Sequence, residues 1–162
     1  MKNMKNRFLA LLPLFALLLV GCGQEKSQPK KTGLVVVNVL DRELYEDCHI
    51  KNSISIPFES IGQCANDIDK NAEIVLYCSN YMCSTSEYAG KKLRELGFTN
   101  VRVYEGGTAE WFQKGLPVEG PSQKSYLKRV GFLGSDSANS IPNISAYELA
   151  EKMGLKPDSV SA

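Results

Sequence analysis

The chain has 162 residues, with 19 basic and 18 acidic side chains and a formal net charge of +1. This length fits one small domain with tails. Because the charge is balanced and no basic cluster occurs beyond the first 21 residues, the sequence argues against a nucleic-acid partner.

The first 21 residues have the pattern of an export signal. Three basic residues are followed by an apolar run over residues 8–20, which is too short to favour a membrane-spanning helix. The run ends in the sequence LVGC, which resembles a bacterial lipobox whose cysteine is Cys22. We therefore expect residues 1–21 to be a lipoprotein signal peptide and Cys22 to be lipidated. The alternative is an uncleaved membrane anchor.

Lipidation at Cys22 predicts a membrane-anchored protein of the cell envelope that works outside the cytoplasm, on a periplasmic or other extracytoplasmic face. Without its first 21 residues the chain has 16 basic and 18 acidic residues, a net charge of −2. Residues 22–33 are polar and contain no aliphatic side chain, so they are predicted to be a flexible tether between the lipid and the domain.

Residues 34–120 alternate between strand-like and helix-like patterns. Asp41 is the expected N-cap of the first helix. Strands that alternate with helices indicate a parallel sheet covered on both faces. The ligand site of such a sheet lies beyond the carboxyl ends of its strands. Strands are predicted at 34–39, 74–77 and 101–104 with a shorter one in 49–57, and helices at 41–47, 58–68 and 108–114.

Cys78 directly follows the central strand, at one of these carboxyl ends. The sequence Ser-Thr-Ser-Glu at 84–87 has the form of a capping box, which predicts the start of a helix. The buried face of that helix would be Ala89, Leu93 and Leu96, and Gly97 would end it. A cysteine between a strand end and a helix N-terminus is expected to be a thiolate with a lowered pKa.

Three blocks in this region have the order and spacing of a single rhodanese-like domain, which they resemble. The blocks are VVVNVLDRELYEDCHIKNSISIP, EIVLYC and LRELGFTNVRVYEGGTAEWFQKGLPVEG, all within residues 34–120. The resemblance implies an α/β fold with a central parallel five-stranded sheet and helices on both faces. It also implies a sulfurtransferase in which Cys78 takes a sulfane sulfur from a small donor, carries it as a persulfide and passes it to a thiol or another nucleophile. No cofactor is implied.

The sequence departs from the family pattern around the site. Asn38 and Leu40 stand where the family usually has an aspartate and an arginine, and Cys48 replaces a common glycine. The active-site loop is slightly longer than usual, and Cys83 stands in place of its arginine. The loop consists of Ser79, Asn80, Tyr81, Met82, Cys83 and Ser84, so it contains no cation.

The lack of a cation predicts weak thiosulfate turnover, because this doubly charged donor would lose a charge-assisted contact, and it favours a persulfide or polysulfide donor. Cys83 leaves an alternative function open, that of a thiol-disulfide redox protein that uses Cys78 and Cys83. A non-catalytic binding module of the same fold is the third interpretation. Cys83 as a packed inert residue or a metal ligand also stays open, although we predict no metal site because no second ligand pair is present. A phosphatase is set aside, because Ser84 stands where that chemistry needs an arginine.

The remaining candidates have structural interpretations. His49 is expected to be hydrogen-bonded near a turn and Trp111 to lie in the core. Cys48 and Cys64 are expected either to be buried or to pair with each other.

Residues 121–162 form a C-terminal extension beyond the family pattern. A helix is predicted at about 145–153, with a capping box that begins at Ser145 and one apolar face. Rhodanese-like domains commonly begin with a similar segment before their first strand, and this chain lacks one there. The hypothesis is that the C-terminal helix fills that vacant place. A loose tail and a truncated second domain are the alternatives.

Overall fold

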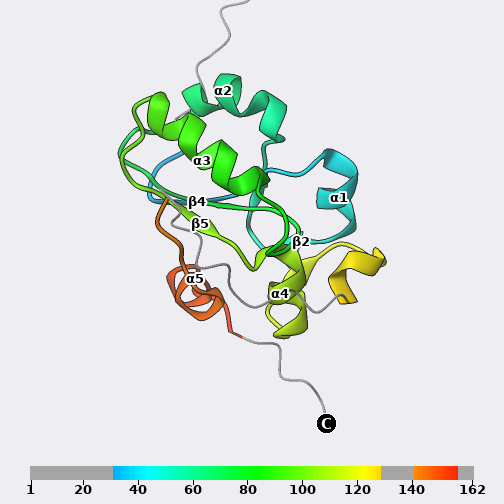
Figure 1. The fold of residues 1–162 in the computed structure, drawn as a ribbon. Helices are drawn as coiled ribbons and strands as arrows, with labels where there is room; N and C mark the ends of the chain where they lie inside the picture. Colours follow the sequence, from blue (N-terminus) through cyan, green and yellow to red (C-terminus); the bar gives the residue numbers. More distant parts are fainter. Residues whose placement is uncertain (1–30, 129–140, 157–162) are drawn as a thin grey trace, which may run out of the picture.

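The computed structural model of the protein describes residues 31–128 and 141–156. Its centre is a parallel sheet of four strands in the order β3-β1-β4-β5 (Figure 1). The long pairing is between β1 and β4, where Leu34 lies opposite Glu73 and Asn38 opposite Tyr77. The four strands are β1 (Leu34–Asn38), β3 (Ile54–Ser55), β4 (Glu73–Tyr77) and β5 (Val101–Tyr104).

Alternate residues of the strands face two separate cores, because successive side chains of a strand point to opposite faces of the sheet. One core contains Val35 and Val37 of β1, and the other contains Val36 between them. Helices cover both faces, which explains why the consecutive residues 35–37 and 74–76 are all apolar and buried. Figure 1 shows α2 and α3 on one side of the sheet and α4 and α5 on the other.

The first layer is dominated by α3 (Thr85–Glu95). Ala89 and Leu93 are fully buried, as predicted, but Leu96 is 41% exposed and the prediction for it was wrong. The helix ends at Glu95, one residue before it, and Gly97 then turns the chain with φ of +88°. The same layer includes α1 (Arg42–Asp47), η1 (Phe58–Ser60), α2 (Ile61–Cys64) and η2 (Ala65–Asp67), so the helix predicted over 58–68 is broken into three short pieces.

Two capping predictions had different outcomes. Asp41 caps α1, because its Oδ1 accepts a hydrogen bond from the Leu44 amide at 3.0 Å. Ser84 precedes α3, but its side chain makes no capping bond. Its φ and ψ of −87° and 1° are not the extended values that a capping side chain needs, so the capping box predicted at 84–87 was wrong.

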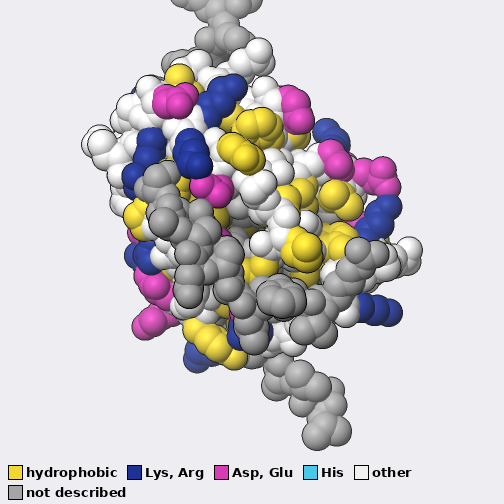
Figure 2. Space-filling model, viewed as in Figure 1, with side chains coloured by type: hydrophobic (Ala, Val, Ile, Leu, Met, Phe, Trp, Pro, Cys, Tyr) yellow, Lys and Arg dark blue, Asp and Glu magenta, His cyan; other side chains and the backbone are white. Residues whose placement is uncertain are grey.

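The second layer contains α4 (Gly107–Gln113) and α5 (Ala146–Lys152). Trp111 is fully buried there, as predicted, and its indole Nε1 donates to the Pro117 carbonyl at 2.9 Å. The short strands β2 (His49–Ile50) and β6 (Val118–Glu119) form an antiparallel pair, and η3 (Ser125–Lys128) packs against α4. Figure 2 shows basic and acidic side chains interspersed on the face seen in Figure 1, without a large patch of one sign among the described residues of that face.

The expectation of five strands was wrong, since the described residues form a parallel sheet of four. Beyond β5, the segment that leads into α5 adds one isolated parallel bridge, between Val103 and Asn143. The Val103 amide donates to the Pro142 carbonyl, and the Ile144 amide donates to the Val103 carbonyl, both at 2.9 Å. Pro142 has no N–H to extend this ladder, and helix α5 begins four residues later, at Ala146, so the edge segment stays too short to be a strand.

The C-terminal helix α5 packs in the same core as β1. This contact is the one expected if α5 takes the place of the segment that commonly precedes the first strand. Ala146 and Leu149 are buried in the same core as Val36. At the helix start the Ser145 hydroxyl accepts from the Glu148 amide at 3.2 Å, as a capping residue should.

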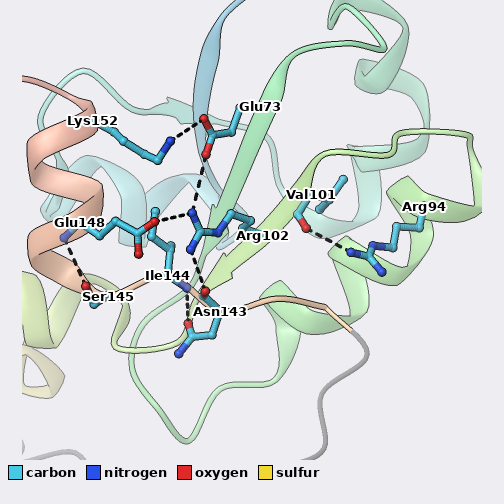
Figure 3. Close-up of polar contacts among 9 residues, drawn as sticks. All are labelled: Glu73, Arg94, Val101, Arg102, Asn143, Ile144, Ser145, Glu148 and Lys152. Carbon is cyan, nitrogen blue, oxygen red and sulfur yellow. Dashed lines mark hydrogen bonds and ion pairs between the residues drawn. The ribbon is translucent and has the colours of Figure 1, made fainter.

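Charged groups also hold α5 to the sheet (Figure 3). Arg102 of β5 lies 2.6 Å from Glu148 and donates to the Asn143 carbonyl at 3.0 Å. Lys152, at the other end of the helix, lies 2.9 Å from Glu73 of β4. The helix is therefore fixed along its length to two strands.

The predicted signal peptide, Cys22 and all but the last three residues of the predicted tether lie outside the described residues. Within residues 31–128 and 141–156, no helix has both the length and the apolar character needed to cross a membrane.

Candidate active site

The loop after β4 is held against the start of α4. The amides of Thr108 and Ala109 donate to the carbonyls of Cys78 and Ser79 at 3.0 and 2.9 Å. Gly107 has a φ of +61°, and a Cβ at this position would lie 2.5 Å from the Cys78 carbonyl oxygen. Glycine is therefore required for the loop and the helix to approach this closely.

A tight turn brings the second cysteine of the loop back to the first. The Cys83 amide donates to the Asn80 carbonyl at 3.0 Å, and Asn80 Oδ1 accepts from the Met82 amide at 3.0 Å. Helix α3 then begins at Thr85. The turn places both thiols beside the first residues of α3, at the carboxyl end of β4.

Cys78 is fully buried and belongs to the aliphatic core on the α3 side of the sheet. Its thiol donates to the Cys83 carbonyl at 2.9 Å, and its sulfur lies 3.4 Å from Ser86 Oγ. The hydrogen bond with the Cys83 thiol and burial both raise the pKa of Cys78, while the Ser86 hydroxyl and amide only partly oppose them. The expectation of a lowered pKa at Cys78 was therefore wrong.

Cys83 is half-buried and has the opposite pKa shift. Its thiol interacts with that of Cys78, with the Thr85 hydroxyl at 3.4 Å and with the amides of Thr85 and Ser79. The hydrogen bond from Cys78 is the largest cause, and together these donors lower the pKa of Cys83 to about 5, against the effect of burial. The contacts around the two thiols thus favour ionisation of Cys83 over ionisation of Cys78.

Tyr81 joins the loop to α4 through a carboxylate. The pKa of Tyr81 is raised to about 12 by burial, by the charge of Glu110 and by a hydrogen bond with this carboxylate. Tyr104 donates to the same carboxylate at 2.8 Å, and Lys114 lies 3.5 Å from it. These residues border a cavity of about 200 Å³ between the loop and the start of α5, so the surroundings of the loop on this side include an acidic group.

The other predicted site residues take structural positions. Met82 is 83% exposed at the tip of the loop. His49 stacks on Tyr45 with ring centroids 3.8 Å apart, and its Nδ1 lies 2.8 Å from the Tyr45 carbonyl oxygen, in agreement with its structural interpretation. Cys48 is buried, Cys64 is half-buried, and both are free thiols, as are Cys78 and Cys83.

The region where the family has a charge pair is uncharged here. Asn38 is fully buried, and its Oδ1 accepts from the Leu40 amide at 2.9 Å. Beside it, the Tyr77 hydroxyl accepts from the Ile50 amide at 3.0 Å and lies 2.8 Å from Ser53 Oγ. Neutral hydrogen bonds therefore replace an ion pair in this part of the fold.

Three residues near the site were not recognised in the sequence: Thr85, Ser86 and Glu110. The capping-box interpretation assigned Thr85 and Ser86 only to the helix start. Glu110 carries no motif, although its spacing of four residues from Lys114 indicates an ion pair on one face of a helix.

Comparison with known proteins agrees with this geometry. A family model described as the rhodanese-like domain matches residues 24–114, which is more than half of the chain. The thiosulfate sulfurtransferase GlpE of Coxiella burnetii is 29% identical over 82 residues, which are 51% of this chain and 75% of GlpE. GlpE of Actinobacillus pleuropneumoniae is 26% identical over 87 residues, 54% of this chain and 79% of that protein.

Solved structures give the same result. The BH2092 protein of Bacillus halodurans is 35% identical, with a TM-score of 0.52 over 56% of this chain and 66% of that chain. The rhodanese-like domain of the Alr3790 protein from Anabaena is 28% identical, with a TM-score of 0.50 over 54% of this chain and 99% of that domain.

Proposed function

Because the chain belongs to the rhodanese-like domain family, we propose that it is a sulfurtransferase that carries a sulfane sulfur as a persulfide on Cys78. The observation that carries this proposal is the group of donors around the two thiols at the end of β4. The amides of Ser79, Thr85 and Ser86 and the hydroxyls of Thr85 and Ser86 all interact with the sulfurs. Such donors stabilise an anionic sulfur, which is both the nucleophile and the leaving group in sulfur transfer.

The donor that we propose is a polysulfide or an organic persulfide and not thiosulfate. No residue from Ser79 to Ser84 is a cation, and Glu110 lies beside Tyr81 of the loop. A doubly charged donor would therefore gain no charge-assisted hydrogen bond from the loop, and the carboxylate of Glu110 offers it none. The acceptor in this proposal is a thiol or another nucleophile.

We also propose that the domain is held at a membrane outside the cytoplasm by lipid on Cys22. Support comes from the sequence of residues 1–33, where an apolar run, a lipobox-like LVGC and a polar tether follow one another in that order. A chain with Cys22→Ala that leaves the membrane fraction of the native cells would support this location. Unchanged membrane association would contradict it.

A second candidate function is thiol-disulfide exchange between Cys78 and Cys83. It is favoured by the hydrogen bond between the two thiols and by the lowered pKa of Cys83, because a thiolate is the reactive form in exchange. An inert binding module would need neither property.

Mass spectrometry of the purified chain after treatment with polysulfide, an organic persulfide or thiosulfate separates these functions. The variants are Cys78→Ser and Cys83→Ser, with Cys64→Ser as a matched control outside the loop. A sulfur adduct that is stable in the wild type and lost in Cys78→Ser supports sulfur transfer. A Cys78–Cys83 disulfide without an adduct supports redox exchange, and the absence of both leaves the binding module.

A further inference from the structure

The two cysteines of the loop differ in their access to solvent. Cys78 has no exposed surface, whereas Cys83 is half-buried and follows the exposed tip residue Met82. We propose that Cys83 takes the sulfur from the donor first and passes it to Cys78, which stores it. This inference rests on the proposed sulfurtransferase function and assigns the order of its steps.

Two contacts argue against Cys78 as the first nucleophile. Its S–H group is directed at the Cys83 carbonyl oxygen, 2.9 Å away, so the proton is held in a hydrogen bond. Ser86 Oγ, 3.4 Å from the sulfur, is itself buried in the first turn of α3. Because Cys78 has no exposed surface, a donor molecule cannot touch its sulfur in the observed arrangement.

The surroundings of Cys83 fit the first step. The amides of Ser79 and Thr85 and the Thr85 hydroxyl surround its sulfur on the protein side, and the half-buried position leaves part of the residue accessible. The lowered pKa, about 5, supports a thiolate at neutral pH. The thiol of Cys78 is its direct neighbour, so a sulfur attached to Cys83 is delivered within the loop.

The two steps balance without an oxidant or a reductant. In the first, the Cys83 thiolate attacks the outer sulfur of a persulfide R–S–SH. A bond forms between Cys83 Sγ and that sulfur, and the S–S bond of the donor breaks. The proton of the outer sulfur passes to the departing R–S group, so R–SH leaves and Cys83 carries an anionic persulfide. In the second, the Cys78 sulfur attacks the same sulfane sulfur. A bond forms between Cys78 Sγ and that sulfur, and its bond to Cys83 breaks. The proton of Cys78 moves to the transferred sulfur, and Cys83 is a thiolate again. The transferred atom stays at the oxidation state of sulfane sulfur throughout.

The arrangement gives the stored sulfur a protected place. A persulfide on Cys78 would lie on the buried side of the loop, where water and oxidants have less access than at Cys83. Such protection matters for a protein that works outside the cytoplasm, where conditions are oxidising.

Rapid mixing with polysulfide tests the order in the unaltered chain. The reaction is stopped at increasing times with an alkylating reagent, the chain is digested, and fragmentation of the peptide that spans both cysteines locates the additional sulfur. We expect the sulfur on Cys83 at the earliest times and on Cys78 later. Sulfur that is found on Cys78 first would overturn the inference, and this measurement needs no mutation.

Variants give a second, independent measurement. In Cys83→Ser we expect the loading of Cys78 to slow at least tenfold, and in Cys78→Ser we expect Cys83 to load at about the wild-type rate, with Cys64→Ser unchanged in both respects. Loading of Cys83→Ser at the wild-type rate contradicts the relay, and so does a Cys78→Ser chain that takes no sulfur. If the wild-type chain itself takes no sulfur from any donor, the proposed function fails and not only the order of its steps.

Discussion

The two faces of the sheet are covered by helices that differ in origin and in role. Helix α3 comes from the middle of the chain, directly after β4, and its first residues contact both loop thiols. Helix α5 comes from the other end of the chain and packs in the core that contains Val36 of β1 and Val75 of β4. Leu93 of α3 and Leu149 of α5 are both fully buried, so the two layers are equally part of the fold.

The two helices are expected to have different roles, α3 in the chemistry of the loop thiols and α5 in the stability of the fold. The described contacts of α5 are with the core, with charged residues of β4 and β5, and with Lys114, whose Nζ lies 4.8 Å from the Tyr147 ring. Tyr147 also borders the cavity that Tyr81 of the loop borders. Variants in α5 should therefore change stability and leave sulfur loading intact. Variants in the first turn of α3 should do the reverse.

The largest expected effect is on stability, from removing one core leucine in each layer. Leu149→Ala and Leu93→Ala should each lower the free energy of unfolding by about 2–5 kcal/mol, because each leaves a cavity in a packed core. Denaturant unfolding measures both, with the exposed residues Glu151→Ala and Glu95→Ala as controls on the same helices. If Leu149→Ala lowers the free energy of unfolding by less than about 1 kcal/mol while Leu93→Ala lowers it by about 2–5 kcal/mol, α5 is a loosely docked tail. The two layers would then not contribute equally to the fold.

Ser86→Ala should affect the chemistry with little loss of stability. Its hydroxyl lies 3.4 Å from Cys78 Sγ, and a hydrogen bond to an anionic sulfur is worth about 1.5–3 kcal/mol, so sulfur loading should slow by about tenfold or more. Ser84→Ala is the matched control, because the Ser84 side chain makes no capping bond and is exposed. Equal loading rates in the two variants would show that the first turn of α3 does not take part.

Much of the architecture could be predicted because the patterns that encode it are local. The apolar runs of β1, β4 and β5 indicated buried strands, and the polar residues Asp41 and Ser145 indicated helix starts that the structure confirms. The position of Cys78 at a strand end also followed from the order of the elements along the chain. These features depend on neighbours in sequence, which a pattern can represent.

The parts that were missed depend on tertiary geometry. The lowered pKa was expected at Cys78 and occurs at Cys83, because the interaction with the Cys83 thiol and burial raise the pKa of Cys78, and the turn at Asn80 brings the two thiols together. The failed cap at Ser84 has a similar origin, since the turn fixes its backbone outside the extended region. No pattern of residue types specifies the direction in which a side chain leaves such a turn.

The lowered pKa of Cys83 leads to a prediction about pH. Alkylation of Cys83 by iodoacetamide should remain fast as the pH falls and should decrease only toward pH 5, because a depressed pKa keeps the thiolate populated below the range of a free thiol. In Cys78→Ala the hydrogen bond between the two side chains is lost, so the midpoint should move upward by about one unit, a tenfold change in the ionisation constant. The adduct on Cys83 is followed by mass spectrometry, with Cys83→Ser as the background. A midpoint that does not move would show that the donors of α3, and not Cys78, set the charge.

The smallest expected effect comes from the charged contacts of α5. Arg102→Met removes the contacts with Glu148 and the Asn143 carbonyl, and Lys152→Met removes the contact with Glu73. Exposed ion pairs contribute little, so Lys152→Met should lower Tm only slightly. Arg102→Met should lower it more, because Arg102 also donates to the backbone of the segment that bridges to β5. Both losses should shrink in about 1 M salt, where charges are screened beyond about 3 Å.

Arg42→Met is the matched control, since its partner Glu46 lies on the same helix, α1, and connects no layers. If Arg102→Met lowered the free energy of unfolding as much as Leu149→Ala, the charged contacts of α5 and not its apolar face would hold the second layer. The two layers would then differ in the interactions that stabilise them as well as in function.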